Sequence, residues 1–342
     1  MKKTVVATVI GSVVASASAM AAEVYKTDEL SVNAYGNLRA RYETTDNGHM
    51  GADSTFTGEG TELGLGVTYF LDNNMYVNGD VMYEMNIIPE DGDGNDDDNF
   101  LKFGSVAIGG DFGEFRIGRM SAVQDTLAGQ YDITWEYGGT ANIKEDAFAT
   151  DRLTNGIQYK VDVNSLSIMA QYHTGDEGVD ANGVADPDLG ELGIDQAYAL
   201  GVAWASDFGL GLSATYTYSE RTEKDMTYGG DDDTSWTLNA TYAYQALSVA
   251  AMYSDYDFAG EERTGIGAMA RYDLPVGVGL YGVYDYVDYD TQDDKLNQFT
   301  IGADYWLNDS VVSYAEYADQ SFDEEVAGSD DSAFTIGMRV YF

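Results

Sequence analysis

Cysteine and histidine, which serve as nucleophiles, general bases and transition-metal ligands, are scarce in this chain. It has no cysteine, so it offers no thiolate nucleophile, no zinc–thiolate site and no disulfide. Its two histidines, His49 and His173, belong to no recognisable motif with a serine, which a hydrolase would need. The sequence therefore predicts that the protein is not an enzyme and that it has no cofactor.

One acidic run resembles a calcium-binding loop. Residues 91–96 read DGDGND and alternate oxygen ligands as such a loop does. The calcium pattern requires glycine at its sixth position and glutamate at its twelfth, where this chain has Asp96 and Lys102. We therefore interpret the run as a solvated acidic loop and predict no metal site. Weak divalent-cation binding beside an anionic lipid surface stays an alternative.

The first 21 residues are typical of an export signal. Lys2 and Lys3 precede a short apolar stretch, residues 4–14, and Ala19-Met20-Ala21 fits the small-x-small cleavage rule. The apolar stretch is too short for a membrane-spanning helix, which needs about 20 residues. We therefore predict a signal peptide over residues 1–21 and one domain over residues 22–342.

The composition is acidic, hydrophobic and rich in tyrosine. With 59 acidic and 17 basic residues the formal net charge is −42, which excludes nucleic acid as a partner because binding it requires Lys and Arg at the phosphates. Hydrophobic residues make up 44% of the chain, too many for a disordered protein. The 27 tyrosines suit a boundary between apolar and wet surroundings. No apolar run of about 18 residues follows the signal, so an integral protein would have to be a closed β-barrel.

The hydrophobic pattern has a period of two residues. Between residues 30 and 42 one parity is apolar and the other polar, as in a strand with one apolar face. The same alternation occurs in residues 235–244, 298–307 and 334–342. These segments predict strands, and no helical stripe of comparable length accompanies them.

The connections between these segments alternate between short and long. Short turns at residues 71–74, 110–113, 164–165, 206–209, 274–277 and 308–310 separate long acidic stretches at residues 89–98, 176–195 and 224–233. The count indicates an all-β, 16-stranded antiparallel transmembrane β-barrel with short periplasmic turns and long acidic extracellular loops. A barrel of this width keeps an aqueous channel. A soluble β-sandwich, which also alternates, is the less favoured interpretation.

Four landmarks, in the correct order, resemble the general trimeric porins of Gram-negative outer membranes. They are the mature start Ala22–Lys26 with Tyr35-Gly36, the strand Asp111–Arg119, the segment Trp135–Gly139, and the terminal Tyr341-Phe342. The resemblance implies a homotrimer in the outer membrane, in contact with its lipid and lipopolysaccharide. It also implies that the third loop, about residues 124–151, folds into the lumen and narrows it.

The same resemblance assigns residues to the two sides of the constriction. Asp132 and Glu136 match the loop carboxylates of the family, and Arg152 matches one position of its basic wall. Asn37 and Glu62 stand where enteric members usually carry Lys and Arg. Three further arginines with lumen parity are expected to compensate in part: Arg39, Arg41 and Arg116.

These features predict a passive diffusion channel for small hydrophilic solutes and ions. A thin basic wall and a strongly negative chain favour a preference for cations, because charges that line a narrow pore enrich counterions. Two other functions stay open. A substrate-specific sugar channel needs a track of aromatic side chains in the lumen, which Tyr35 and Tyr76 alone do not make, and an adhesive or structural barrel would have a plugged lumen.

Overall fold

The computed structural model describes residues 21–47, 51–88, 99–144, 149–175, 194–221, 232–258, 261–290, 294–323 and 331–342. Residues 1–20 of the predicted signal peptide, His49 and nearly all of the three long acidic stretches lie outside the described residues. The described residues comprise the strands, the short turns between them and most of residues 122–151.

The described chain is almost entirely strand. The strands are β1 (Ala22–Lys26), β2 (Leu30–Asn47), β3 (Gly51–Thr57), β4 (Thr61–Phe70), β5 (Tyr76–Met85), β6 (Phe100–Gly110), β7 (Gly113–Ser121), β8 (Arg152–Val163), β9 (Leu166–His173), β10 (Ile194–Ala205), β11 (Leu210–Arg221), β12 (Asp233–Tyr244), β13 (Leu247–Phe258), β14 (Glu261–Asp273), β15 (Val278–Tyr289), β16 (Asp294–Asn308), β17 (Val311–Phe322) and β18 (Asp331–Tyr341).

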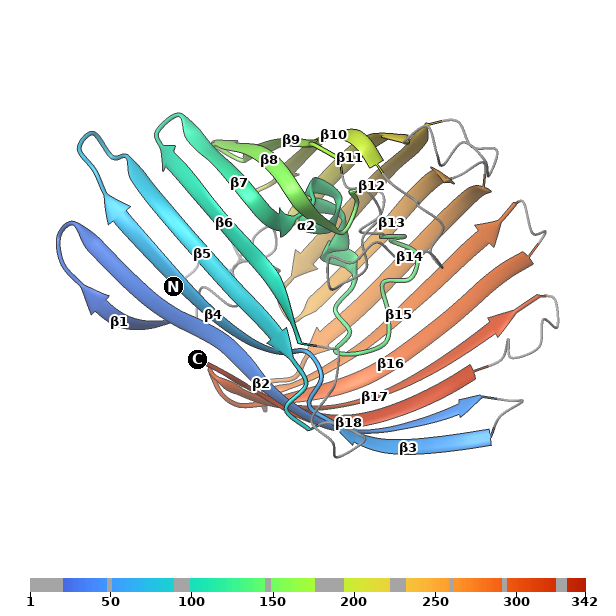
Figure 1. Cartoon of the computed structure of the whole chain (residues 1–342). Coiled ribbons are helices and arrows are strands. Elements are labelled where there is room, and N and C mark those ends of the chain that lie inside the picture. The colour runs from blue at the N-terminus through green and yellow to red at the C-terminus, as the bar shows by residue number, and fades with distance from the viewer. Residues whose placement is uncertain are drawn as a thin grey trace.

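These segments form one closed antiparallel barrel (Figure 1). The barrel closes where β18 pairs with β2, with Val340 opposite Leu38. The short β1 pairs with the other half of β2, so β1 and β18 share one position in the wall. Likewise β3 and β4 pair with successive halves of β2 and share another position. The wall therefore has 16 strand positions, and the predicted barrel is confirmed.

The apolar parity of each strand faces outward. On β18, Ile336 is 53% exposed while its neighbour Thr335 is fully buried. On β12, Leu238 is 50% exposed and Thr237 only 1%. A soluble sandwich would bury the apolar parity, because removing that surface from water drives its folding. The opposite arrangement, apolar outside and polar inside, is that of a membrane barrel.

Short turns join the strands at one end of the barrel (Figure 1). Several place a residue in the left-handed region, such as Asn164 with φ of 56° and Gly209 with φ of 98°. At Gly209 a Cβ atom would lie 2.2 Å from the carbonyl oxygen of Ala243, so glycine alone fits there. The turn between β12 and β13, at Gln245 and Ala246, was not predicted from the sequence.

The segment between β7 and β8 leaves the wall and enters the barrel (Figure 1). It begins with the helix α2 (Val123–Ala128), continues as the 3-10 turn η1 (Gly129–Tyr131), and is described to Lys144. The helix and the turn contact strands in the range β9 to β14. Within the described residues, no helix is long and apolar enough to cross a membrane.

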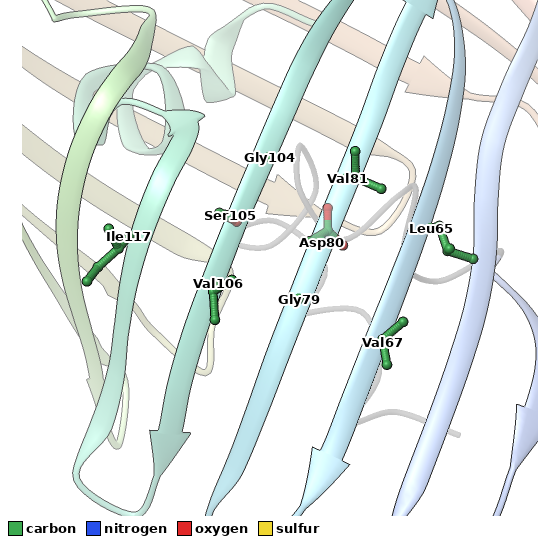
Figure 2. A pocket seen from close by; sticks show the side chains of 9 residues that line it. All are labelled: Leu65, Val67, Gly79, Asp80, Val81, Gly104, Ser105, Val106 and Ile117. Carbon is green, nitrogen blue, oxygen red and sulfur yellow. The ribbon is translucent and has the colours of Figure 1, made fainter.

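The outer surface of β4 to β7 carries a shallow apolar hollow (Figure 2). Gly79 and Gly104 contribute no side chain there, and Leu65, Val81 and Ile117 form its sides. The hollow lies on the apolar outer face rather than in the charged lumen. It is therefore separate from the interior of the barrel.

Candidate constriction site

Small and polar residues of the inner wall form the surface on which the inward loop docks. At Gly201 of β10 a Cβ atom would lie 2.4 Å from Val123 and 2.6 Å from Leu127, so α2 packs directly on the backbone of that strand. Ser213 of β11 donates a hydrogen bond to the Leu127 carbonyl at 2.7 Å, and Asn239 of β12 donates one to the Ala128 carbonyl at 3.4 Å. The inner wall thus supplies donors to the end of α2, where the last carbonyls of a helix lack partners within the helix.

A buried carboxylate on β15 holds the middle of the loop. Asp285 accepts hydrogen bonds from the Tyr131 hydroxyl at 2.7 Å and from the Ala141 backbone N–H at 3.2 Å. The Tyr131 hydroxyl also accepts from the Asn142 N–H at 3.1 Å. Tyr131 is fully buried, and its burial, followed by the charge of Asp285, raises its pKa well above the ordinary value. Tyr131 therefore stays a neutral donor that ties the loop to the wall.

A second carboxylate, Glu316 on β17, holds the tip of the loop. It accepts hydrogen bonds from the backbone N–H groups of Trp135, of Glu136 at 2.8 Å and of Tyr137 at 3.3 Å. The Tyr281 hydroxyl of β15 donates to the same carboxylate at 2.7 Å. Charge-assisted hydrogen bonds of this kind are about twice as strong as neutral ones. Glu316 therefore fixes where the tip of the loop stands in the lumen.

At this tip Glu136 lies between two arginines of the wall. Its carboxylate is 3.2 Å from Arg41 of β2 and 2.9 Å from Arg339 of β18, the two strands that close the barrel. It also accepts a hydrogen bond from the Tyr314 hydroxyl. Burial alone raises the pKa of Glu136, but Arg339 and Arg41 outweigh it and lower the pKa below the ordinary value. We name Glu136, Arg41 and Arg339 the Glu136 clamp.

The predicted wall residue Arg39 lies beside a network of alternating charges. It donates to Asn37 at 2.8 Å and lies 3.9 Å from Glu62, the two positions at which this chain departs from the enteric pattern. Lys102 of β6 lies 2.5 Å from Glu62 and 2.8 Å from Glu84. A lysine from another strand thus compensates for the carboxylate at position 62.

The other two predicted basic residues have partners of their own. Arg116 pairs with Glu114 at 2.9 Å on its own strand and donates to Ser105 at 2.8 Å. Arg152 lies 3.5 Å from Asp151, with its guanidinium 5.3 Å from the centre of the Phe100 ring. The structure brings Arg41 to the tip of the loop, and it places Arg116 in an ion pair on the wall.

The predicted loop carboxylate Asp132 is used within the loop itself. It accepts hydrogen bonds from the backbone N–H of Thr134 at 3.0 Å and from the Thr134 hydroxyl at 2.6 Å. A Cβ atom at Gly139 would lie 2.5 Å from this carboxylate, so the glycine lets the loop close around it. Burial raises the pKa of Asp132. The described contacts of Asp132 thus shape the turn of the loop rather than join it to the basic wall.

Sequence reasoning placed Glu316 and Arg339 on the lumen face but did not assign either residue to the constriction. Both stand at lumen parity on the last two strands, so alternation places them on the inner face. Alternation does not show which residues of the inner face meet a loop about 180 residues earlier in the chain. Only the register of the closed barrel brings these residues together.

A closed 16-stranded barrel with an apolar outer face, a charged inner face and the segment between β7 and β8 inside its lumen defines an outer-membrane diffusion pore. The model of the Gram-negative porin family matches residues 6–325. The chain belongs to this family. It is accordingly a passive diffusion channel of the Gram-negative outer membrane, and not an enzyme.

Curated relatives align along the whole chain. Outer membrane protein S2 of Salmonella typhi is 25% identical over 394 residues, which cover 100% of both chains. Outer membrane porin N of Escherichia coli K12 is 26% identical over 361 residues, which cover 95% of this chain and 94% of that protein.

Solved structures share the fold. Salmonella typhi OmpF, in complex with daunomycin, matches with a TM-score of 0.78 at 17% identity, covering 94% of this chain and 100% of that one. The anion-selective porin from Comamonas acidovorans matches with a TM-score of 0.77 at 17% identity, covering 92% of this chain and 100% of that one. At these identities the likeness concerns the fold alone.

Proposed function

We propose that this porin is a trimeric, cation-preferring pore for small hydrophilic solutes and ions, narrowed by the loop tip at the Glu136 clamp. The observation that carries the proposal is the position of Glu136, which Glu316 holds by its backbone and Arg41 and Arg339 hold by its side chain. A solute that passes the tip therefore meets a fixed set of charges in a space with low-dielectric walls.

The balance of charge on the inner wall supports the preference for cations. Arg41 faces three carboxylates, Glu43 at 3.0 Å, Glu59 at 3.1 Å and Glu136. Lys102 likewise faces two carboxylates. The basic groups of this region are thus neutralised by carboxylates that outnumber them, and the remaining field attracts cations. The fold does not set the sign, since a neighbour described as anion-selective shares it.

Reversal potentials in a planar bilayer under a salt gradient test the ion preference. We expect a potential that shows preferential passage of the cation and that weakens at high salt, because salt screens the field over about 8 Å at physiological strength. A potential of anion-selective sign from folded protein would contradict the preference. Absence of conductance would contradict the open pore.

The proposed trimer has a separate test. Vibrio cholerae OmpT, which matches with a TM-score of 0.68 at 16% identity over 92% of this chain, was solved in a trimer form. Cross-linking in native membranes should capture three copies of this chain, and conductance steps should arrive in threes. Capture of monomers alone would contradict the trimer. Contact with lipopolysaccharide is part of the same proposal, and loss of trimers on its removal would support it.

A further inference from the structure

Four aromatic side chains from the loop and the last strands meet in the lumen beside the Glu136 clamp. Trp135 of the loop stacks on Tyr314 of β17, with ring centres 5.2 Å apart and planes 21° apart. Trp135 also lies 6.2 Å from Trp306 of β16, which stacks on Tyr341 of β18 at 5.9 Å and 19°. We name these four residues the aromatic cluster.

Strand parity places Trp306 and Tyr341 of the aromatic cluster on the lumen face of the barrel. Trp306 shares the lumen parity of Asp304, which is 2% exposed, whereas its neighbour Tyr305 faces outward and is 47% exposed. Tyr341 shares the lumen parity of Arg339. Trp306 pairs with Val312, next to the short turn between β16 and β17. The aromatic cluster therefore extends from the constriction towards the short-turn end of the pore.

The aromatic cluster presents free hydrogen-bond donors. Trp306 and Tyr341 are both partly exposed, and their indole N–H and hydroxyl form no hydrogen bond with any residue that the structure describes. The nearby acceptors are already engaged. Asp304 binds Arg271 through both oxygens, at 2.6 and 3.0 Å, and Glu316 accepts from the loop tip. A ligand here has to offer hydrogen-bond acceptors and a flat face that stacks on a ring.

The charges around the aromatic cluster oppose a cationic ligand. The Arg339 guanidinium already lies 4.8 Å from the Trp135 ring centre and 5.5 Å from that of Tyr314. A second cation on these rings would be repelled by the first, because like charges at this range disfavour each other. A neutral ring with hydroxyl groups meets both conditions, since its C–H face stacks on indole and its oxygens accept from the N–H and O–H donors.

The other two lumen aromatics named from the sequence, Tyr35 and Tyr76, do not combine a stacking ring with a free hydrogen-bond donor. The Tyr35 hydroxyl donates a hydrogen bond to Asp80, and the Tyr76 hydroxyl donates one to Glu114 at 2.7 Å. Both hydroxyls are thus occupied by carboxylates of the wall. The stacked pair Trp306 and Tyr341 keeps its donors available.

We propose that the aromatic cluster is a weak binding subsite for the pyranose rings of neutral sugars, with Trp306 as its stacking surface. The subsite rests on the proposed function, because it acts on solutes that enter an open pore. It would make a general pore retain sugars briefly as they pass, without closing it to other solutes.

Sugar block of the ion current tests the subsite, with maltotriose as the probe. Wild-type channels should show brief, concentration-dependent interruptions of the current. Sorbitol, which has hydroxyl groups but no ring, should cause none. In Trp306→Leu the half-blocking concentration should rise at least about fivefold, since one aromatic contact typically contributes that much. Tyr305→Leu changes the adjacent outward residue and is the matched control. Maltotriose should block this variant at the same concentration as wild type.

Different results would contradict the sugar subsite and the proposed open pore. Equal block of wild type and Trp306→Leu, or normal ion conductance with no maltotriose block, would overturn the subsite and leave the pore intact. Absence of ion conductance from folded wild-type protein would overturn the proposed function instead. Trp306→Phe keeps a ring but removes the N–H, so it should retain part of the block and serves if Trp306→Leu fails to fold.

Discussion

Glu316 accepts a hydrogen bond from the backbone N–H of Glu136 at 2.8 Å, so one carboxylate of the lumen positions another. Glu316 is fixed on the wall, whereas Glu136 is carried by a loop that could otherwise take many positions. The charge at the constriction is thus placed by backbone contacts as well as by the arginines that face it.

Removing the charge of Glu316 should loosen the loop tip. In Glu316→Gln the three backbone N–H groups lose a charged acceptor, and we expect more open-channel noise and a loss of stability of about 1–3 kcal/mol. Current noise and thermal unfolding measure the two effects. Glu114→Gln, which neutralises a lumen carboxylate paired with Arg116, is the control and should leave the noise unchanged.

Removing the charge of Glu136 from the clamp should change the ion selectivity of the pore. In Glu136→Gln, Arg41 and Arg339 lose the carboxylate between them, so the reversal potential should move towards anion preference. A reversal potential identical to that of wild type would show that Glu136 does not face the path of the ions. The double variant with Arg339→Gln should partly reverse the shift, because it removes one of the uncompensated cations.

The Glu136 clamp should also make the current noise depend on pH in a defined way. The pKa of Glu136 is lowered, so the clamp contributes stability above the unfolded pKa of about 4.3 and loses it as pH falls through the lower folded value. The part of the current noise that depends on Glu136, taken as the difference between wild type and Glu136→Gln, should therefore stay constant from pH 7 to about pH 4.3 and change only below it. Glu136→Gln should lack this acid transition. A difference between wild type and Glu136→Gln that already changes at pH 6 would contradict the assignment to Glu136, whereas a rise shared by both belongs to other carboxylates such as Asp132, whose pKa burial raises.

Asp132, although also acidic and on the loop, should matter little for selectivity. Asp132→Asn keeps an oxygen that accepts from Thr134, so the turn survives and the reversal potential should stay at the wild-type value. Asp132→Ala removes that acceptor and should raise the noise. A shift of the reversal potential in Asp132→Asn comparable to that of Glu136→Gln would show that Asp132 acts on the ions directly.

The docking of α2 on the wall should depend on the absence of a side chain at Gly201. In Gly201→Val the new side chain meets Val123 and Leu127, so the loop has to move away from the wall and conductance should fall. Single-channel conductance measures the change. Gly79→Ala, where a Cβ atom meets nothing within 4 Å, is the matched control and should conduct as wild type does.

Alternation identified the faces of most strands but was unclear over residues 278–290. On β15 the inward residues Tyr281, Val283 and Val287 are apolar and buried, and Val283 packs in a cluster with Tyr131 of the loop. Apolar residues therefore occur on both faces of this strand, with the carboxylate of Asp285 between Val283 and Val287 on the face towards the loop. An inward face that packs against the loop with apolar side chains does not show the simple apolar–polar pattern.

The class of fold could be predicted from the sequence alone, because period two, turn residues and short connections are local properties of neighbouring residues. The sequence also placed Arg41 in the lumen and Glu136 on the loop. Folding of the whole barrel determines that Glu136 meets Arg41 and Arg339, that Asp132 turns into its own loop, and that Trp135, Trp306 and Tyr341 gather in the lumen. These contacts join residues up to about 200 positions apart. They depend on strand register and barrel closure, which no local pattern specifies.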